Sequence, residues 1–223
     1  MILKIYYGGY KNNTDVPKLN LSMNKIVLST TYFPNIQYIS KFMLADKIII
    51  DIYEHYSRQS YRNRCYILSA NGLLPLSVPV KKNNNNFSKD ILIDYTTNWQ
   101  KNHQIAIMSA YKNSPYYIFF IDDFSFVFDK KEKFLIDLNL KILEKILKIL
   151  NIKTSYEFSN DFIKDTENNF RATIHPKPQQ NQSDNDFKIK PYYQVFSEKF
   201  NFQPNLSILD LLFMKGKESI CFL

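Results

Sequence analysis

Glycine is scarce in this chain of 223 residues, which contains only four. They are Gly8, Gly9, Gly72 and Gly216. A P-loop and the dinucleotide-binding turn of a Rossmann fold both need glycines at fixed spacing, because the backbone must approach a phosphate closely. The four positions cannot supply either pattern. We therefore do not expect nucleotide binding through a standard glycine-rich loop.

Cysteine is also rare, and long apolar runs are absent. Cys65 and Cys221 form neither a disulfide framework nor a CxxC zinc motif. No stretch approaches the roughly 20 apolar residues that span a bilayer. The first ten residues lack the apolar core and cleavage site of a signal peptide. We expect a cytoplasmic protein with reduced thiols, no membrane span, no metal site and no cofactor.

Arginine is rare although the net charge is +8, since only four of the 29 basic residues are arginine. The lysines are spread along the chain among many asparagines. A nucleic-acid interface requires basic residues that cluster on one face. The charge therefore does not favour a nucleic-acid partner, and the sequence indicates no particular oligomeric state.

Residues 1–22 differ from the rest of the chain. They show no clear periodicity and are interrupted by Pro17. We interpret them as an N-terminal extension, either foreign to the native protein or poorly ordered. Residues 23–223 are then expected to form a single domain.

From residue 23 the pattern predicts an α/β or α+β fold, with a mixed sheet packed by several helices. The predicted strands cover residues 25–29, 47–53, 91–95 and 154–159. The predicted helices cover residues 35–45, 98–114 and 132–152, and a last helix begins near Ser207 as N-cap. Residues 61–80 predict a β-hairpin whose type I′ turn is formed by Asn71 and Gly72. Residues 164–190 are polar and predict a long loop, either mobile or functional, that contains His175.

The most distinctive stretch runs from Gln59 to Cys65 and contains two of the rare arginines. Strand alternation would place Arg62 and Arg64 on one face, and Asn63 and Cys65 on the other. Paired guanidinium groups can hold a carboxylate or a phosphate. The alternative is a solvated strand face with surface charge. The rarity of arginine favours an anion or sugar-phosphate grip, whereas Cys65 is better explained as a small buried residue.

Trp99 and His103 lie one turn apart on the predicted helix. A histidine can act as a general base, and an indole can pack on a sugar ring. The alternative is a core histidine beside a buried indole, and the sequence does not separate the two. Asp51 and His55 have no second histidine or cysteine at ligand spacing, so we predict no metal there.

These stretches together resemble the WbqC-like protein family. The resemblance rests on an ordered set of motifs: Tyr32-Phe33-Pro34, Ser60-Tyr61-Arg62-Asn63-Arg64, Trp99 with His103, Ser109-Ala110-Tyr111 before Pro115, Tyr193-Gln194-Val195-Phe196, and the segment 204–213. It covers about residues 24–221, although residues 213–216 depart from the family's usual ending. The resemblance implies a bacterial protein of surface-polysaccharide biosynthesis, that is, of O-antigen or lipopolysaccharide.

The leading hypothesis is a transferase that modifies a nucleotide-linked sugar, with acyl or aminoacyl transfer to an amino sugar as the reaction it suggests. In it, Arg62 and Arg64 bind the anionic substrate and His103 takes the proton. Asn63, Trp99 and Tyr111 shape the pocket. The alternative is a non-catalytic binding or scaffold protein of a polysaccharide assembly system, which predicts an exposed apolar patch in place of a polar cleft.

Overall fold

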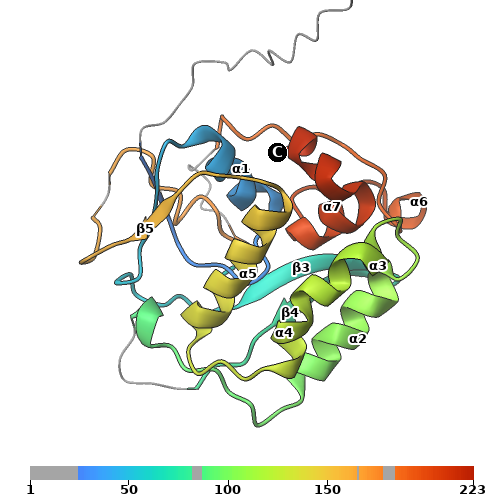
Figure 1. Ribbon diagram of the computed structural model, residues 1–223, viewed down its shortest axis with the longest axis horizontal. Helices are drawn as coiled ribbons and strands as arrows, with labels where there is room; N and C mark the ends of the chain where they lie inside the picture. The colour runs from blue at the N-terminus through green and yellow to red at the C-terminus, as the bar shows by residue number, and fades with distance from the viewer. Residues whose placement is uncertain (1–24, 82–86, 165, 178–183) are drawn as a thin grey trace, which may run out of the picture.

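The computed structural model describes residues 25–81, 87–164, 166–177 and 184–223. The predicted N-terminal extension lies outside these ranges. The fold is mixed α/β, with several helices around a small parallel sheet and an antiparallel hairpin (Figure 1). The predicted fold class is therefore confirmed.

The parallel sheet is built from three short, apolar strands in the order β1-β2-β5. They are β1 (Ile26–Leu28), β2 (Ile48–Ile50) and β5 (Tyr156–Phe158). Helix α1 (Ile36–Leu44) connects the first two strands, because parallel neighbours need a crossover. All residues of β1 and β2 are buried, as expected of parallel strands covered on both faces.

A later segment extends this sheet beyond β1. Val27 forms a parallel bridge with Asn169, and its backbone bonds to Asn168 and Phe170. The predicted polar loop 164–190 therefore contains a stretch that is attached to the sheet. This attachment brings the loop beside the carboxyl ends of the strands.

The antiparallel hairpin consists of β3 (Arg64–Ser69) and β4 (Gly72–Ser77). The two residues between the strands are Ala70 and Asn71, one position earlier than expected from the sequence. The positive φ of 100° occurs at Gly72, which begins the second strand. Residues 91–95 form isolated bridges and no regular strand, because their partners are loop residues.

The helices fill the remaining layers. α2 (Trp99–Tyr111), α3 (Tyr117–Phe120) and α4 (Ser125–Asp129) lie together on one side, and α1 and β5 lie on the other, with α5 (Leu135–Ile149) between them (Figure 1). Short helical turns occupy residues 88–90, 121–124 and 216–222. The chain ends with α6 (Ser197–Phe200) and α7 (Ile208–Lys215), and Ser207 caps α7 by accepting from the Leu209 amide, as predicted.

α5 follows its predicted amphipathic pattern. Leu135, Leu138, Ile142 and Ile146 are buried in the core. The charged residues of the opposite face are exposed. The helix therefore covers the core with one stripe and presents the other to solvent.

Candidate functional site

Polar side chains gather where the parallel strands end. Ser29 follows β1, Asp51 follows β2, and Ser159 follows β5. The Ser159 hydroxyl donates to the Asp51 carboxylate at 2.8 Å, and Asp51 is fully buried. The carboxyl edge of an open parallel sheet is where ligands bind in many α/β proteins, because the connecting loops leave a crevice there.

A buried ion pair stands at this edge. Arg62 donates from Nε to Glu54 Oε1 at 2.7 Å and from Nη2 to both Glu54 Oε2 and the Ser29 hydroxyl. Glu54 also accepts from Ser29 at 2.9 Å and from Ser88 at 3.3 Å. The two side chains are only 8% and 4% exposed. So many partners fix the guanidinium in one orientation, with its charge matched by the carboxylate.

A second arginine connects the loop to the sheet. Arg171 donates to Asp51 and to the carbonyl of Ile163, and its Nε donates to Asn169 at 3.0 Å. Its guanidinium also lies 5.2 Å from the centre of the Phe162 ring. Because Asp51 is buried at the end of β2, this ion pair ties residues 162–171 to the parallel sheet.

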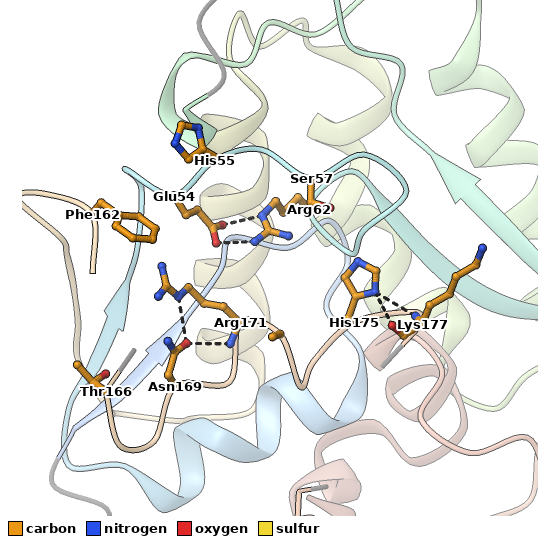
Figure 2. Close-up of a pocket in the computed structure, with 11 residues that line it drawn as sticks. Glu54, His55, Ser57, Arg62, Phe162, Thr166, Asn169, Arg171, His175 and Lys177 are labelled. Atoms are coloured by element: carbon orange, nitrogen blue, oxygen red, sulfur yellow. Dashed lines mark hydrogen bonds and ion pairs between the residues drawn. The ribbon is translucent and has the colours of Figure 1, made fainter. Parts of the chain in front are cut away.

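Both ion pairs border a cavity of about 730 Å³. The cavity is lined by Glu54, His55, Ser57, Arg62, Phe162, Thr166, Asn169, Arg171, Ala172, His175 and Lys177 (Figure 2). Glu54, which lines the cavity, is paired with Arg62, and the adjacent Asp51 is paired with Arg171. The ammonium of Lys177 therefore adds a net positive charge at the rim. Cavities of several hundred Å³ hold small-molecule ligands.

His175 reaches the cavity from the loop, and its ring is held by one backbone group. Its Nδ1 lies 3.1 Å from both the carbonyl oxygen and the amide nitrogen of Lys177. With a proton on Nδ1 the ring donates to the carbonyl, and without one it accepts from the amide. Figure 2 shows Nε2 turned toward the side of Arg62 and Ser57. Nε2 can therefore gain or lose a proton while Nδ1 keeps a partner.

Of the predicted site residues, Arg62 lines this cavity and Arg64 does not. The expectation that strand alternation places the two on one face is wrong, because β3 begins at Arg64 and residues 61–63 form a turn. Arg64 instead donates to Ser77 at 2.9 Å and lies 3.4 Å from the Tyr66 hydroxyl.

His103 and Trp99 lie in the interior. His103 is 6% exposed, and its Nδ1 is 2.9 Å from the Tyr32 hydroxyl. Burial lowers the pKa of His103 to about 4, and a hydrogen bond to the Ser77 backbone opposes this only in part. Trp99 is 3% exposed and packs edge to face on His103 at 5.2 Å. The structure thus places the imidazole in the core, away from the cavity that Arg62 lines.

Asn63 and Tyr111 also make internal contacts. The Asn63 amide donates to the Val78 carbonyl at 2.9 Å. The fully buried Tyr111 hydroxyl donates to Asp210 at 2.8 Å, and burial raises the pKa of that carboxyl. Burial also raises the pKa of the Cys65 thiol, which argues against a nucleophile there.

Sequence reasoning missed Glu54 and Arg171 and gave no role to His175. The rarity of arginine was a usable signal for Arg171, since it is one of four in the chain. Glu54 gave no such signal, because its partners come from three separate segments.

The described residues contain no group of three or more histidine, cysteine or carboxylate side chains placed to hold a metal ion. None of the helices that these residues form has the length and apolar character that a bilayer crossing requires.

Comparison with known proteins gives one match. The sequence model of the WbqC-like protein family matches residues 30–182, a range that includes every side chain lining the cavity. No curated protein and no solved structure matches the chain. The matched range covers more than half of the sequence, so the chain belongs to the WbqC-like protein family.

Proposed function

We propose that this protein is a transferase of surface-polysaccharide biosynthesis that binds a nucleotide-linked sugar at the carboxyl edge of its parallel sheet. The observation that carries the proposal is the polar cavity that Arg62, His175 and Lys177 line from two distant segments, with the His175 ring turned toward the side of Arg62 (Figure 2). The role in polysaccharide biosynthesis, of O-antigen or lipopolysaccharide, comes from the family resemblance. The cavity adds a place where an anionic sugar derivative fits.

The cavity suits an anion for electrostatic reasons. Arg62 keeps its Nε and Nη2 on Glu54 and Ser29, which leaves Nη1 turned to the side of His175 (Figure 2). Lys177 adds a flexible positive charge at the rim. A fixed guanidinium and a mobile ammonium together suit a phosphate, the first by geometry and the second by charge.

His175 is our candidate for proton transfer, in the place first given to His103. Its Nε2 faces the cavity, and its Nδ1 has a backbone partner in either tautomer. In acyl or aminoacyl transfer to an amino sugar, the attacking amine forms the new bond to the acyl carbon and the bond to the leaving group breaks. Nε2 would take the proton that the amine releases.

A scaffold role is the second candidate, and one observation favours it. Ile118 and Phe119 of α3 are 75% and 69% exposed, which is unusual for two adjacent large apolar side chains. The scaffold hypothesis, however, also predicts that no polar cleft is present. The cavity at the sheet edge therefore favours the transferase.

Ligand binding tests the proposal directly. We expect nucleotide-linked sugars to raise the midpoint of thermal unfolding of the full chain, because a ligand that binds only the folded state stabilises it. Lys177→Ala should weaken binding about fivefold, because one charge at the rim contributes about 1 kcal/mol to the binding free energy. The matched control is Lys101→Ala, an exposed lysine of α2 outside the cavity.

Two results would count against the transferase. One is the absence of any shift from a panel of nucleotide sugars, sugar phosphates and acyl donors. The other is an equal loss of binding in Lys101→Ala and Lys177→Ala, which would locate the anion elsewhere on the basic surface.

A further inference from the structure

A row of aromatic side chains borders one end of the cavity. It consists of Tyr53, Phe87, His55 and Phe162, which we call the aromatic row. The His55 ring stacks on Phe87 with centroids 5.3 Å apart and an interplanar angle of 24°. Phe162 lies 6.5 Å from His55, and Tyr53 lies 6.2 Å from Phe87. Only His55 and Phe87 are stacked; the Tyr53–Phe87 contact is edge to face and the His55–Phe162 contact is tilted by 47°.

The hydrophobic core does not account for this row. Its three hydrophobic members, Tyr53, Phe87 and Phe162, neither belong to the core cluster nor pack against it. Phe162 is 47% exposed, and His55 is exposed as well. Both rings nevertheless line the cavity, where an apolar face is in contact with water. Apolar surface held in this way beside polar groups is typical of a ligand contact.

Phe162 is held in place from one side. The Arg171 guanidinium lies 5.2 Å from its ring centre, and Arg171 is itself fixed by Asp51, Asn169 and Ile163. The Arg171 cation on one face of the Phe162 ring draws the electron density of the ring toward itself. The opposite face then suits a flat π system better than the C–H groups of a sugar, which need an electron-rich face.

The two ends of the cavity differ in chemistry. In Figure 2, Phe162 and His55 lie on the Glu54 side of the buried ion pair, and His175 and Lys177 lie on its Arg62 side. One end is therefore aromatic and the other carries the imidazole and the excess positive charge. An elongated ligand with a flat apolar end and an anionic middle matches this order.

We infer that the aromatic end of the cavity, formed by Phe162 and His55, binds the base of a nucleoside diphosphate. This inference rests on the proposed function and deepens it. The base packs on the free faces of the Phe162 and His55 rings and is not sandwiched between the two rings. A sandwich needs about 7 Å between parallel rings, two contact distances, and these rings are 6.5 Å apart and tilted by 47°.

This placement orders the rest of the substrate. With the base at Phe162, the diphosphate lies near Arg62 Nη1 and the sugar reaches His175 and Lys177. The group that receives the transferred acyl chain would then be next to Nε2 of His175. The base is recognised by ring stacking, which is consistent with a chain that lacks the glycines of a phosphate-binding loop.

Calorimetric titration of the full chain tests the inference with three ligands: a nucleoside diphosphate, a sugar 1-phosphate and inorganic pyrophosphate. We expect Phe162→Ala to weaken nucleoside diphosphate binding roughly 5- to 100-fold, the range for loss of one stacked base. Binding of the other two ligands should stay within about twofold, because they have no base to stack. Phe162→Tyr should retain affinity, since it keeps the ring.

Phe158→Ala is the matched control. Phe158 lies on β5, is 44% exposed and does not line the cavity, so its removal should leave all three affinities unchanged. Circular dichroism of each variant shows whether it is folded. Equal weakening of all three ligands in Phe162→Ala, or no weakening of any, would overturn the inference while the proposed function stands. If the wild type binds none of them and no nucleotide sugar, the proposed function itself fails.

Discussion

His103 shows how burial decides what a residue can do. Helix periodicity places Trp99, His103, Ala106 and Ala110 on one face of α2, and all are buried except Ala106, which is half-buried. Periodicity does not say whether that face meets a cleft or the core, because both require apolar neighbours. The Tyr32 hydroxyl and the Ser77 backbone complete the surroundings of the imidazole, and neither lies near it in the sequence.

The lowered pKa of His103 predicts how stability depends on pH. An unfolded histidine binds a proton near pH 6.5, whereas the folded protein binds it only near pH 4. Between these values the unfolded state holds more protons, so stability falls as the pH falls. The loss approaches about 3 kcal/mol at pH 4. Urea unfolding at pH 7, 5.5 and 4 measures it.

The variant His103→Gln provides the comparison for this prediction. It is less stable at pH 7, because the packing against Tyr32 and Trp99 changes, but it lacks the titrating group. Its stability should therefore fall by about 3 kcal/mol less than that of the wild type over the same pH range. Parallel curves for the two proteins would show that His103 is not the group responsible.

At the scale of elements, the sequence predicts most regular structure well. Local periodicity carries the signal for these elements. The apolar runs correctly predicted strands within 25–29 and 47–53, and the recurrence of apolar and charged residues correctly predicted a helix within 132–152. The strand at 91–95 failed because its neighbours are loop residues. Residues 164–190 were predicted as a long polar loop, either mobile or functional. The attachment of this segment to β1 depends on partners far away in the chain.

The candidate site was predictable only in part, for the same reason. Composition singled out Arg62, which lines the cavity, but its partner Glu54 is joined to it by a turn that strand alternation does not describe. Arg171 meets Asp51 across 120 positions. Such long-range ion pairs leave no trace in local spacing, so the cavity could not be foreseen from the sequence.

A buried ion pair joins the far end of the loop region to α1. It gives a prediction at the scale of elements. Lys41 and Asp184 are 2.6 Å apart with side chains 0% and 4% exposed, and Lys41 also lies over the Phe170 ring. Lys41→Met leaves a buried carboxylate without its cation. It should lower the free energy of unfolding by about 3–5 kcal/mol in urea denaturation.

Two further variants identify the cause of that loss. The double variant Lys41→Met with Asp184→Leu should recover much of the stability, because no buried charge is left unpaired. Lys47→Met breaks the exposed pair with Glu157 and should cost less than about 1 kcal/mol. Equal losses in Lys41→Met and Lys47→Met would mean that burial does not strengthen the first pair.

For the whole molecule, the sequence predicts one domain from residue 23 to the end. One continuous core cluster includes side chains from the parallel sheet, the hairpin, α2, α5 and α7. The single core leads us to expect one cooperative unfolding step. Trp99 is the single tryptophan and is 3% exposed, so its fluorescence reports on the packing of α2.

We therefore expect two urea unfolding curves to coincide. One is measured by Trp99 fluorescence, and the other by far-ultraviolet circular dichroism, which averages over all helices and strands. Both curves should give the same midpoint and the same slope. Separate midpoints would divide the chain into more than one folding unit and contradict the single domain.

The two cavity walls come from segments that are far apart in the sequence, which has a consequence for folding during translation. Residues 54–62 supply one wall and residues 162–177 supply the other. Translation delivers the first wall well before the second, and domains begin to fold as their segments leave the ribosome. Nascent chains that stop before residue 175 lack both the His175 imidazole and the Lys177 ammonium. The cavity is therefore complete only when the late segment has joined the edge of the early sheet.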